Sequence, residues 1–238
     1  MKKLLTLFLS ESSRAIAVAF INFFSAVFIF KLLTGFGFSD RVALASVFGF
    51  NLACFIFKFA ANFLAEELSL RHGLKKSLSL GGFLLIVCLS LLVLAGRHPV
   101  FLLLSAVFLG LGSAFYWFGY HSALVKNSET NSFGINVGNA GILRAFLLLT
   151  APLLGGALAS LGGFPLLFLA ALFFACLSLF FTQLMSEKRT HYDTSFKEVV
   201  GLLKRHRWAA LAYMGNSAVG DAYVAAVPLT VYFSLGHE

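Results

Sequence analysis

Four side chains that could do chemistry gather near the end of one apolar run. Tyr116, Trp117, Tyr120 and His121 belong to the run that covers residues 99–126. In a helix, residues four apart lie on the same side, so Trp117 pairs with His121 and Tyr116 pairs with Tyr120 on one broad aromatic face. The rings and hydroxyls could contact a solute, and the imidazole could carry a proton near neutral pH. The alternative is that these rings only anchor the end of a helix at a membrane surface.

Ionisable groups inside other apolar runs form a second set of candidates. Lys58 and Arg144 could bind an anionic solute, or could pair with acidic groups elsewhere in the protein. Asp221, with Ser217 one helical turn before it, could hold a coupling ion or contact a solute, or could pair with another helix. Lys31 lies near the end of its run, so we expect its ammonium group to reach the surface. A charge in hydrocarbon costs at least about 2.5–3.5 kcal/mol, so we expect Lys58, Arg144 and Asp221 to face the interior of a bundle.

Two asparagines, Asn22 and Asn51, complete the candidates for a solute site. Asn51, Lys58 and Asn62 are separated by seven and four residues, which places them on one helical face. Asn22 and Lys31 are nine residues apart and point in opposite directions, so they do not form one site.

The overall composition shows what kind of fold must position these residues. Of the 238 residues, 59% are hydrophobic and 12% are charged, whereas soluble domains carry about 25% charged residues. Most of the surface must face something other than water, so we predict a polytopic protein in a lipid bilayer. The net charge of +8 comes from basic residues between the apolar runs, so we expect no nucleic-acid partner.

The sequence gives no indication of a cofactor, a metal or an enzyme. Cys54, Cys88 and Cys176 are far apart and have neither metal-ligand nor redox spacing, so we interpret them as small buried apolar residues. The chain has no Gly-x-x-x-x-Gly-Lys-Ser/Thr loop, which argues against an ATP-driven pump. No apolar run holds paired carboxylates or a His-x-x-x-His arrangement, which argues against an intramembrane enzyme.

Apolar runs of about 20 residues predict an all-α polytopic membrane protein. Seven runs are long enough to span a bilayer: 15–33, 42–64, 77–96, 100–124, 135–160, 164–183 and 209–233. We expect four parts: a cytoplasmic N-terminal segment (1–14), a bundle of six transmembrane helices (15–185), a basic cytoplasmic linker with an amphipathic helix (186–207) and a seventh transmembrane helix (208–238). A lone span after a block of six has no evident partner, so we expect the chain to be a fragment that lacks a C-terminal helical half.

The basic residues predict the orientation of the chain in the membrane. With the N-terminus inside, 13 of the 18 Lys and Arg lie in inner segments, three lie within spans, and only Arg41 and Arg97 lie outside. This bias predicts a cytoplasmic N-terminus, in a multi-pass protein of the plasma (inner) membrane.

Polar groups are divided unevenly among the predicted spans. The third and sixth spans (77–96 and 164–183) hold little beyond Ser, Cys, Thr and Gln, whereas the other five hold the candidates above. We therefore expect the third and sixth spans to be peripheral and to contact lipid, and the others to line or flank a wet interior.

With this plan, the chain resembles the N-terminal half of a major facilitator superfamily transporter, followed by the first helix of the second half. The link between the second and third spans matches the Arg-x-Gly-x-Lys-Lys core of the family's loop motif at four positions: Arg71, Gly73, Lys75 and Lys76. The usual aspartate of the motif is replaced by Leu70, and Glu66 or Glu67 could substitute for it. The resemblance implies gating contacts at this loop.

A second motif lies in the fifth span. Residues 151–156 (Ala-Pro-Leu-Leu-Gly-Gly) are similar to the Gly-Pro-x-x-Gly-Gly end of the family's antiporter motif, and we expect Pro152, Gly155 and Gly156 to allow close helix packing. The arginine that proton-coupled drug exporters of the family carry in the fourth span has no counterpart here. The resemblance implies a secondary active transporter that moves a small solute by alternating access, coupled to a proton or another cation. The alternatives are a non-transporting membrane assembly or sensor protein and an intramembrane enzyme.

Overall fold

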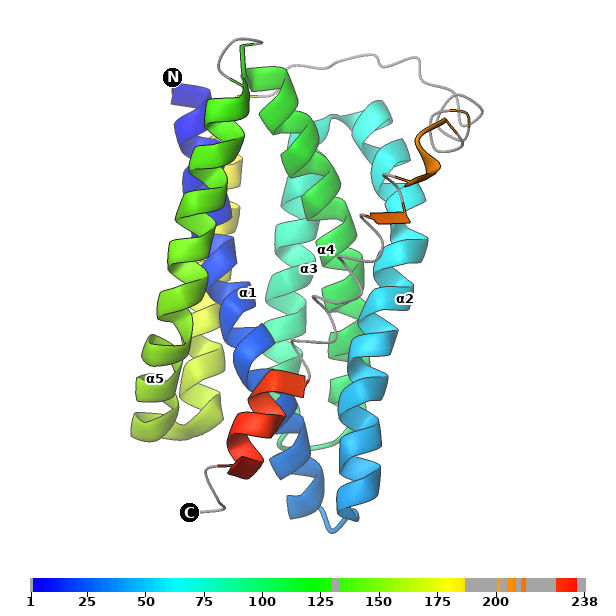
Figure 1. The fold of residues 1–238 in the computed structure, drawn as a ribbon, viewed down its shortest axis with the longest axis vertical. Helices are drawn as coiled ribbons and strands as arrows, with labels where there is room; N and C mark the ends of the chain where they lie inside the picture. Colours follow the sequence, from blue (N-terminus) through cyan, green and yellow to red (C-terminus); the bar gives the residue numbers. More distant parts are fainter. Residues whose placement is uncertain are drawn as a thin grey trace.

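The fold is a bundle of long helices, seen in a computed structural model that describes residues 2–129 and 133–186, together with 201, 205–208, 211–212 and 226–234. Five helices follow one another along the chain: α1 (Lys2–Gly35), α2 (Asp40–His72), α3 (Leu74–Leu94), α4 (Val100–Asn127) and α5 (Phe133–Gln183). Across these described ranges there is no β-strand, so the predicted all-α fold is confirmed (Figure 1). A short helical stretch also covers residues 226–234.

Helix α5 consists of two rods joined at a pair of glycines. Gly162 and Gly163 leave the helical conformation, and the φ of Gly163 is +69°, a value that a side chain disfavours. Pro165 follows at the start of the second rod, where a helix tolerates its missing N–H. Figure 1 shows the two rods of α5 next to each other. The chain therefore turns between the predicted fifth and sixth spans.

Close contacts at glycines hold α3 and α4 together. A Cβ atom on Gly81 would lie 2.6 Å from the backbone nitrogen of Tyr116 and 2.8 Å from the carbonyl oxygen of Gly112. A Cβ atom on Gly119 would lie 2.9 Å from the side chain of Leu78. Small residues that let two backbones approach are typical of helix packing in membranes, where lipid removes the ordinary hydrophobic driving force.

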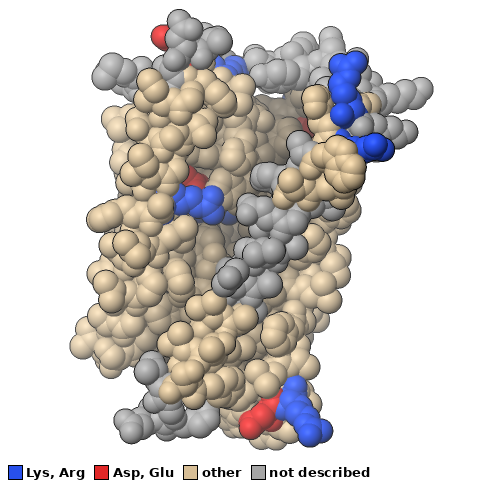
Figure 2. All heavy atoms as spheres, viewed as in Figure 1, with Lys and Arg blue, Asp and Glu red and all other residues tan. Residues whose placement is uncertain are grey.

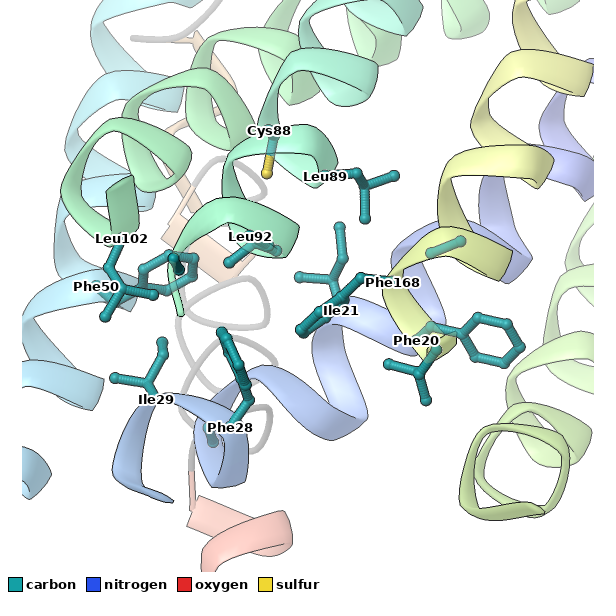
Figure 3. Close-up of a cluster of buried hydrophobic side chains, with 14 of the residues drawn as sticks. Phe20, Ile21, Phe28, Ile29, Phe50, Cys88, Leu89, Leu92, Leu102 and Phe168 are labelled. Atoms are coloured by element: carbon teal, nitrogen blue, oxygen red, sulfur yellow. The ribbon is translucent and has the colours of Figure 1, made fainter. Parts of the chain in front are cut away.

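The largest buried apolar cluster draws side chains from all five helices (Figure 3). Its members include Phe20, Ile21, Phe28, Ile29, Phe50, Cys88, Leu89, Leu92, Leu102 and Phe168. Phe28 packs edge-on against Phe168, with ring centroids 4.9 Å apart. Cys88 is buried as we predicted, whereas Cys176 is exposed, so the prediction of burial is wrong for Cys176.

The outer surface of the bundle is strongly apolar. All five helices are long and apolar enough to span a membrane, which fits the predicted class. Leu149, Leu153 and Leu161 of α5 are 75%, 77% and 81% exposed. Soluble monomers seldom expose such contiguous apolar surface, so these side chains belong against lipid or other apolar helices.

Helix α3 packs into the bundle on one side and is exposed on another, where Phe83 is 54% exposed. One side of it is buried from Ser77 to Leu92, and the buried hydroxyl of Ser77 donates a hydrogen bond to the carbonyl of Phe115. Helix α2 instead exposes a long series of apolar side chains from Val42 to Leu64. The second rod of α5 likewise exposes Leu169, Phe173 and Phe180, so a peripheral position of the third and sixth spans stays a prediction.

Helix α1 runs without a break from Lys2 to Gly35, so the predicted N-terminal segment (1–14) continues into the first span as one helix. At about 1.5 Å per residue this helix is about 50 Å long, which exceeds the hydrocarbon thickness of about 30 Å. Where the membrane boundary falls along α1 stays a prediction. The linker that was predicted to hold an amphipathic helix (186–207) lies largely outside the described residues.

Candidate functional site: a charged and aromatic cluster between three helices

Three helices bring charged and aromatic side chains together inside the bundle. Helix α1 contributes Glu11 and Arg14, α4 contributes Tyr116 and Trp117, and α5 contributes Arg144; we call these five residues the central cluster. Figure 2 shows acidic and basic atoms together midway along one face, while the other charged atoms on that face lie toward its two ends. Charges at such a depth require partners in the protein or contact with water.

The indole ring of Trp117 lies beside both arginines of the cluster. The guanidinium carbon of Arg144 is 4.5 Å from the ring centroid of Trp117, and that of Arg14 is 5.2 Å from it. Arg14 is also 4.2 Å from the ring centroid of Tyr116. All three distances lie within the range of about 6 Å over which an aromatic face attracts a cation. The rings of α4 thus hold cations from both α1 and α5.

Glu11 is the acidic member of the cluster. Its side chain is 6% exposed and that of Arg14 is 2% exposed. The Glu11 carboxylate interacts electrostatically with both Arg14 and Arg144. Two buried atoms, Oε2 of Glu11 and Nε of Arg14, have no hydrogen-bond partner among the residues that the structure describes. Buried polar atoms usually have partners, so the cluster retains unused hydrogen-bonding capacity.

Ser10 fixes the position of Glu11, its neighbour in the sequence. The Ser10 hydroxyl lies 3.1 Å from the Tyr116 hydroxyl, 2.8 Å from the Thr182 hydroxyl and 3.2 Å from the Ser178 hydroxyl. It is also 3.1 Å from the carbonyl oxygen of Ser178, to which it can donate. These buried contacts join α1 to α4 and to the second rod of α5, so they set the rotation of α1 at the cluster.

A narrow cleft opens beside the central cluster. Nine residues of α1, α4 and α5 line it: Phe8, Glu11, Ser12, Ala15, Tyr120, Ala140, Leu143, Arg144 and Leu147. The space inside is about enough for one water molecule, so these helices lie close together around the charges in this conformation. The cleft brings the Glu11 carboxylate and the exposed Arg144 to a common opening.

The aromatic candidates on α4 form the two pairs that their spacing predicts. Trp117 stacks on His121 with ring centroids 5.1 Å apart, and Tyr116 stacks on Tyr120 at 6.2 Å. Tyr116 is completely buried and its hydroxyl contacts Ser10, and its role as a solute contact stays a prediction. Trp117, Tyr120 and His121 remain predicted contacts, because Tyr120 lines the cleft and His121 is exposed.

The candidates on α1 and α2 lie outside the central cluster. Asn22 is half-buried and follows Glu11 by three turns on nearly the same face of α1. The Asn51 amide donates to the carbonyl of Val47 in its own helix, at 2.9 Å. Lys58 is half-buried on α2, where the backbone passes close to Gly110 of α4. No described contact brings these three to the cluster, and their site roles stay predictions.

The seventh span falls largely outside the described residues. Ser217 and Asp221 are both among the residues that the structure does not describe. The stretch at 226–234 packs against α1, since the rings of Tyr232 and Phe233 lie 6.1 and 5.2 Å from that of Phe30. Lys31 is exposed, and its ammonium nitrogen lies 5.2 Å from the ring of Tyr232.

The loop motif forms the sharp turn between α2 and α3. Gly73 has a φ of +96°, in the region where a Cβ atom is strained, so glycine is the residue that suits this position. Glu66 is half-buried and Lys76 is exposed. The conformation of the turn therefore explains the glycine of the motif without reference to gating.

Two charged residues of the motif have partners at this end of the bundle. Arg71 forms a salt bridge with Glu67, one turn earlier, at 2.6 Å. The Lys75 ammonium donates to the carbonyl of Gln183 at 2.6 Å, and the Gln183 amide donates to the Ser79 hydroxyl at 2.9 Å. These bonds join the start of α3 to the end of α5. A gating role for Glu66, Glu67, Arg71, Gly73, Lys75 and Lys76 stays a prediction.

The second motif allows α5 to approach α1 closely. A Cβ atom on Gly155 would collide with the ring of Phe24, whereas one on Gly156 would meet nothing within 4 Å. The predicted role in close packing is therefore confirmed for Gly155.

Sequence reasoning missed Glu11 and Arg14 as functional residues. We placed both in a segment outside the first span, because they interrupt its apolar pattern. The available signal was their spacing of three, which puts an acid and a base on one side of a helix with apolar residues before and after them. Two opposite charges on one face of an otherwise apolar helix indicate a buried polar site.

The comparisons with known proteins agree with this architecture. A search of curated proteins found no match. Among solved structures, the chain is similar to one described as "Crystal structure of peptide transporter POT in complex with sulfate", with a TM-score of 0.67 and 19% identity. The match covers 100% of this chain and 47% of the solved one, so the chain spans about half of that protein. At this identity the likeness shows the fold alone. The sequence model of the Major Facilitator Superfamily matches residues 12–238, and the chain belongs to this superfamily.

Proposed function

We propose that this chain is part of a secondary active transporter that moves a small solute across the membrane by alternating access. Membership of the Major Facilitator Superfamily and a fold shared with a peptide transporter support this proposal. The chain spans about half of that transporter, so we expect a second helical bundle in the whole protein. In transporters built from two such halves, the solute site lies near the middle of the membrane between them.

The observation that carries the proposal is the composition of the central cluster. Three helices place two guanidinium groups beside one indole ring, and a carboxylate that interacts with both of them, inside an apolar bundle. A protein that serves only as an assembly or sensor unit has no need of such charges, whose burial is costly. A transporter does need polar groups that can exchange partners as a solute or a coupling ion arrives. We therefore place the solute site at this cluster and its cleft.

The proposal also includes the orientation of the chain in the membrane and the ion to which transport is coupled. The bias of basic residues supports a cytoplasmic N-terminus in the plasma (inner) membrane. The start of α1, the turn at Gly73 and the end of α4 would then lie on the cytoplasmic side. We propose that transport is coupled to a proton or another cation.

The test asks whether the cleft opens to both sides of the membrane. Ala140 lines the cleft, and Ala140→Cys would be introduced into the full-length protein after replacement of its native cysteines. A membrane-impermeant maleimide would then be applied to oriented vesicles from one side at a time. The proposal predicts labelling from each side, because the cleft opens alternately.

Leu153→Cys provides the control for this experiment. Leu153 is 77% exposed on the apolar surface of α5, where lipid or another helix should keep an aqueous reagent away. We expect it to label from neither side. Labelling of Ala140→Cys from a single side under all conditions would contradict alternating access at this cleft.

A further inference from the structure

We propose that the central cluster binds an anionic group of the solute, a carboxylate, a phosphate or a sulfate, at the guanidinium of Arg144. The inference rests on the proposed function, because it names the chemical class of solute that the transporter's site takes. Its basis is the charge of the cluster. Two guanidinium groups face one carboxylate, so within the described part of the chain the cluster carries one positive charge in excess.

Arg144 is the arginine that is placed to meet a ligand. Arg14 is almost completely buried and shares its helix with Glu11, three residues away. Arg144 is exposed, comes from a different helix and lines the cleft together with Glu11. One carboxylate cannot neutralise both cations, and the acid is tied to the buried one by sequence spacing. The positive charge of Arg144 is therefore the one that an anion can reach.

The contact with Trp117 leaves the guanidinium of Arg144 able to bind an oxyanion. Its guanidinium carbon lies 4.5 Å from the indole ring centroid. A guanidinium that rests on an aromatic face keeps the N–H groups along its edge available, and two of them can bind two oxygens of one oxyanion. Lysine would offer a point charge without this geometry. The pairing of arginine with tryptophan thus favours a planar or tetrahedral oxyanion over a neutral group.

The remaining polar groups of the cleft limit where the anion binds. Glu11 repels an anion, so the ligand must approach on the side of Arg144 that is turned away from the carboxylate. Tyr120 also lines the cleft and carries a hydroxyl group that can donate to an anion, whereas the Ser12 hydroxyl donates to the carbonyl of Phe8. The cleft therefore contains charged and neutral donors around a single acid.

The experiment measures anion binding by the purified full-length protein. The thermal unfolding midpoint would be followed during titration with sodium phosphate, sodium sulfate, sodium acetate and sodium citrate, with chloride holding the ionic strength constant. Choline chloride serves as the cationic comparison. We expect saturable stabilisation by at least one oxyanion and none by choline. Comparing the carboxylates with phosphate and sulfate identifies which oxyanion the site prefers.

Variants locate the binding site within the protein. Arg144→Gln should weaken binding of the active anion at least tenfold, and Arg144→Lys should weaken it less, because it keeps the charge but loses the planar fork. Lys31→Gln is the matched control, since it removes a cation that also lies beside an aromatic ring but outside the central cluster. Lys58→Gln tests the other cation that could bind an anionic solute. Absence of saturable binding by every anion, or equal binding by the Arg144→Gln variant, would overturn the inference. Loss of binding in Lys58→Gln alone would also overturn it.

The accessibility experiment at Ala140 separates this inference from the proposed function. If Ala140→Cys labels from both sides while no anion binds, alternating access stands and the solute is not anionic at Arg144. If the residue labels from one side only, the proposed function fails whatever the anion titrations show.

Discussion

The guanidinium of Arg144, on α5, lies 4.5 Å from the indole centroid of Trp117, on α4. Arg14 of α1 lies 5.2 Å from the same ring, so Trp117 is the side chain that both cations of the central cluster share. A charged side chain of α1 and one of α5 therefore contact the same side chain of α4. Replacing Trp117 should therefore reduce transport more than the loss of its apolar contacts alone would.

Replacing Trp117 tests the contribution of the shared ring. Trp117→Leu should reduce solute transport by about 3-fold to 30-fold, because a cation–aromatic contact contributes about 0.5–2 kcal/mol. Trp117→Phe should retain part of the activity. Trp208→Leu is the matched control, since Trp208 also lies beside an arginine, Arg207, at 5.5 Å, but is exposed outside the cluster. Equal transport by both leucine variants in proteoliposomes would remove the role of the ring.

Neutralising Glu11 should destabilise the protein by leaving a buried cation without its acid. Removing an acid that interacts with a buried arginine leaves an uncompensated buried charge, which costs up to about 3–5 kcal/mol, whereas an exposed ion pair contributes about 0–1 kcal/mol. Glu11→Gln should therefore lower the thermal unfolding midpoint clearly, while Glu67→Gln, which breaks the exposed pair with Arg71, should leave it nearly unchanged.

The double variant Glu11→Gln with Arg14→Gln gives the second half of this test. It removes the acid and the base together, so we expect it to be more stable than Glu11→Gln alone. Additive losses in the double variant would show that Glu11 and Arg14 do not depend on each other.

Helix α3 should tolerate an added methyl group at Gly82, which faces α5, but not at Gly81, which faces α4. At Gly81 a Cβ atom would lie 2.6 Å from the backbone nitrogen of Tyr116, which cannot move independently of α4. At Gly82 the nearest atom is a side-chain carbon of Leu179, 3.4 Å away. Gly81→Ala should cost about 1–3 kcal/mol through overpacking, whereas Gly82→Ala should be neutral or slightly stabilising. Unfolding midpoints of the two variants that cannot be distinguished would contradict the packing of α3 on α4.

The turn at Gly73 should resist substitution because of its backbone conformation. With a φ of +96°, alanine at this position is strained, and we expect Gly73→Ala to cost about 1–2 kcal/mol. Gly96→Ala is the control, because Gly96 is exposed and a Cβ atom there would meet nothing within 4 Å. Measured unfolding midpoints should fall for Gly73→Ala only. If Gly73→Ala keeps its stability and loses transport, the glycine serves gating and not the turn.

The periodicity and length of the apolar runs predicted most of the fold. The helices at α2, α3 and α4 fall where apolar runs of about 20 residues lie, because a helix is how a chain satisfies its backbone in lipid. The break at Gly162 and Gly163 falls between the predicted fifth and sixth spans (135–160 and 164–183). The four-residue spacing of Trp117 and His121 also predicted that they share one face of α4, where their rings stack, since that geometry is local to one helix.

The central cluster could not be predicted in the same way, because it depends on which helices meet. Hydropathy placed Glu11 and Arg14 outside the first span, and nothing in the sequence connects them with Trp117 or Arg144. Their meeting depends on the rotation of α1, which is fixed by the contacts of Ser10 with α4 and α5. The polarity of the spans likewise did not indicate that α3 approaches α4 closely at Gly81.

The most direct test of the account is a structure of the full-length protein with the anion selected by the titrations. The account predicts ligand density at the cleft, with an oxygen within hydrogen-bond distance of the Arg144 guanidinium, and with that guanidinium still resting on Trp117. Density bound elsewhere, for example beside Lys58 on α2, with the cleft closed and Arg144 paired to an acid of the protein, would contradict it.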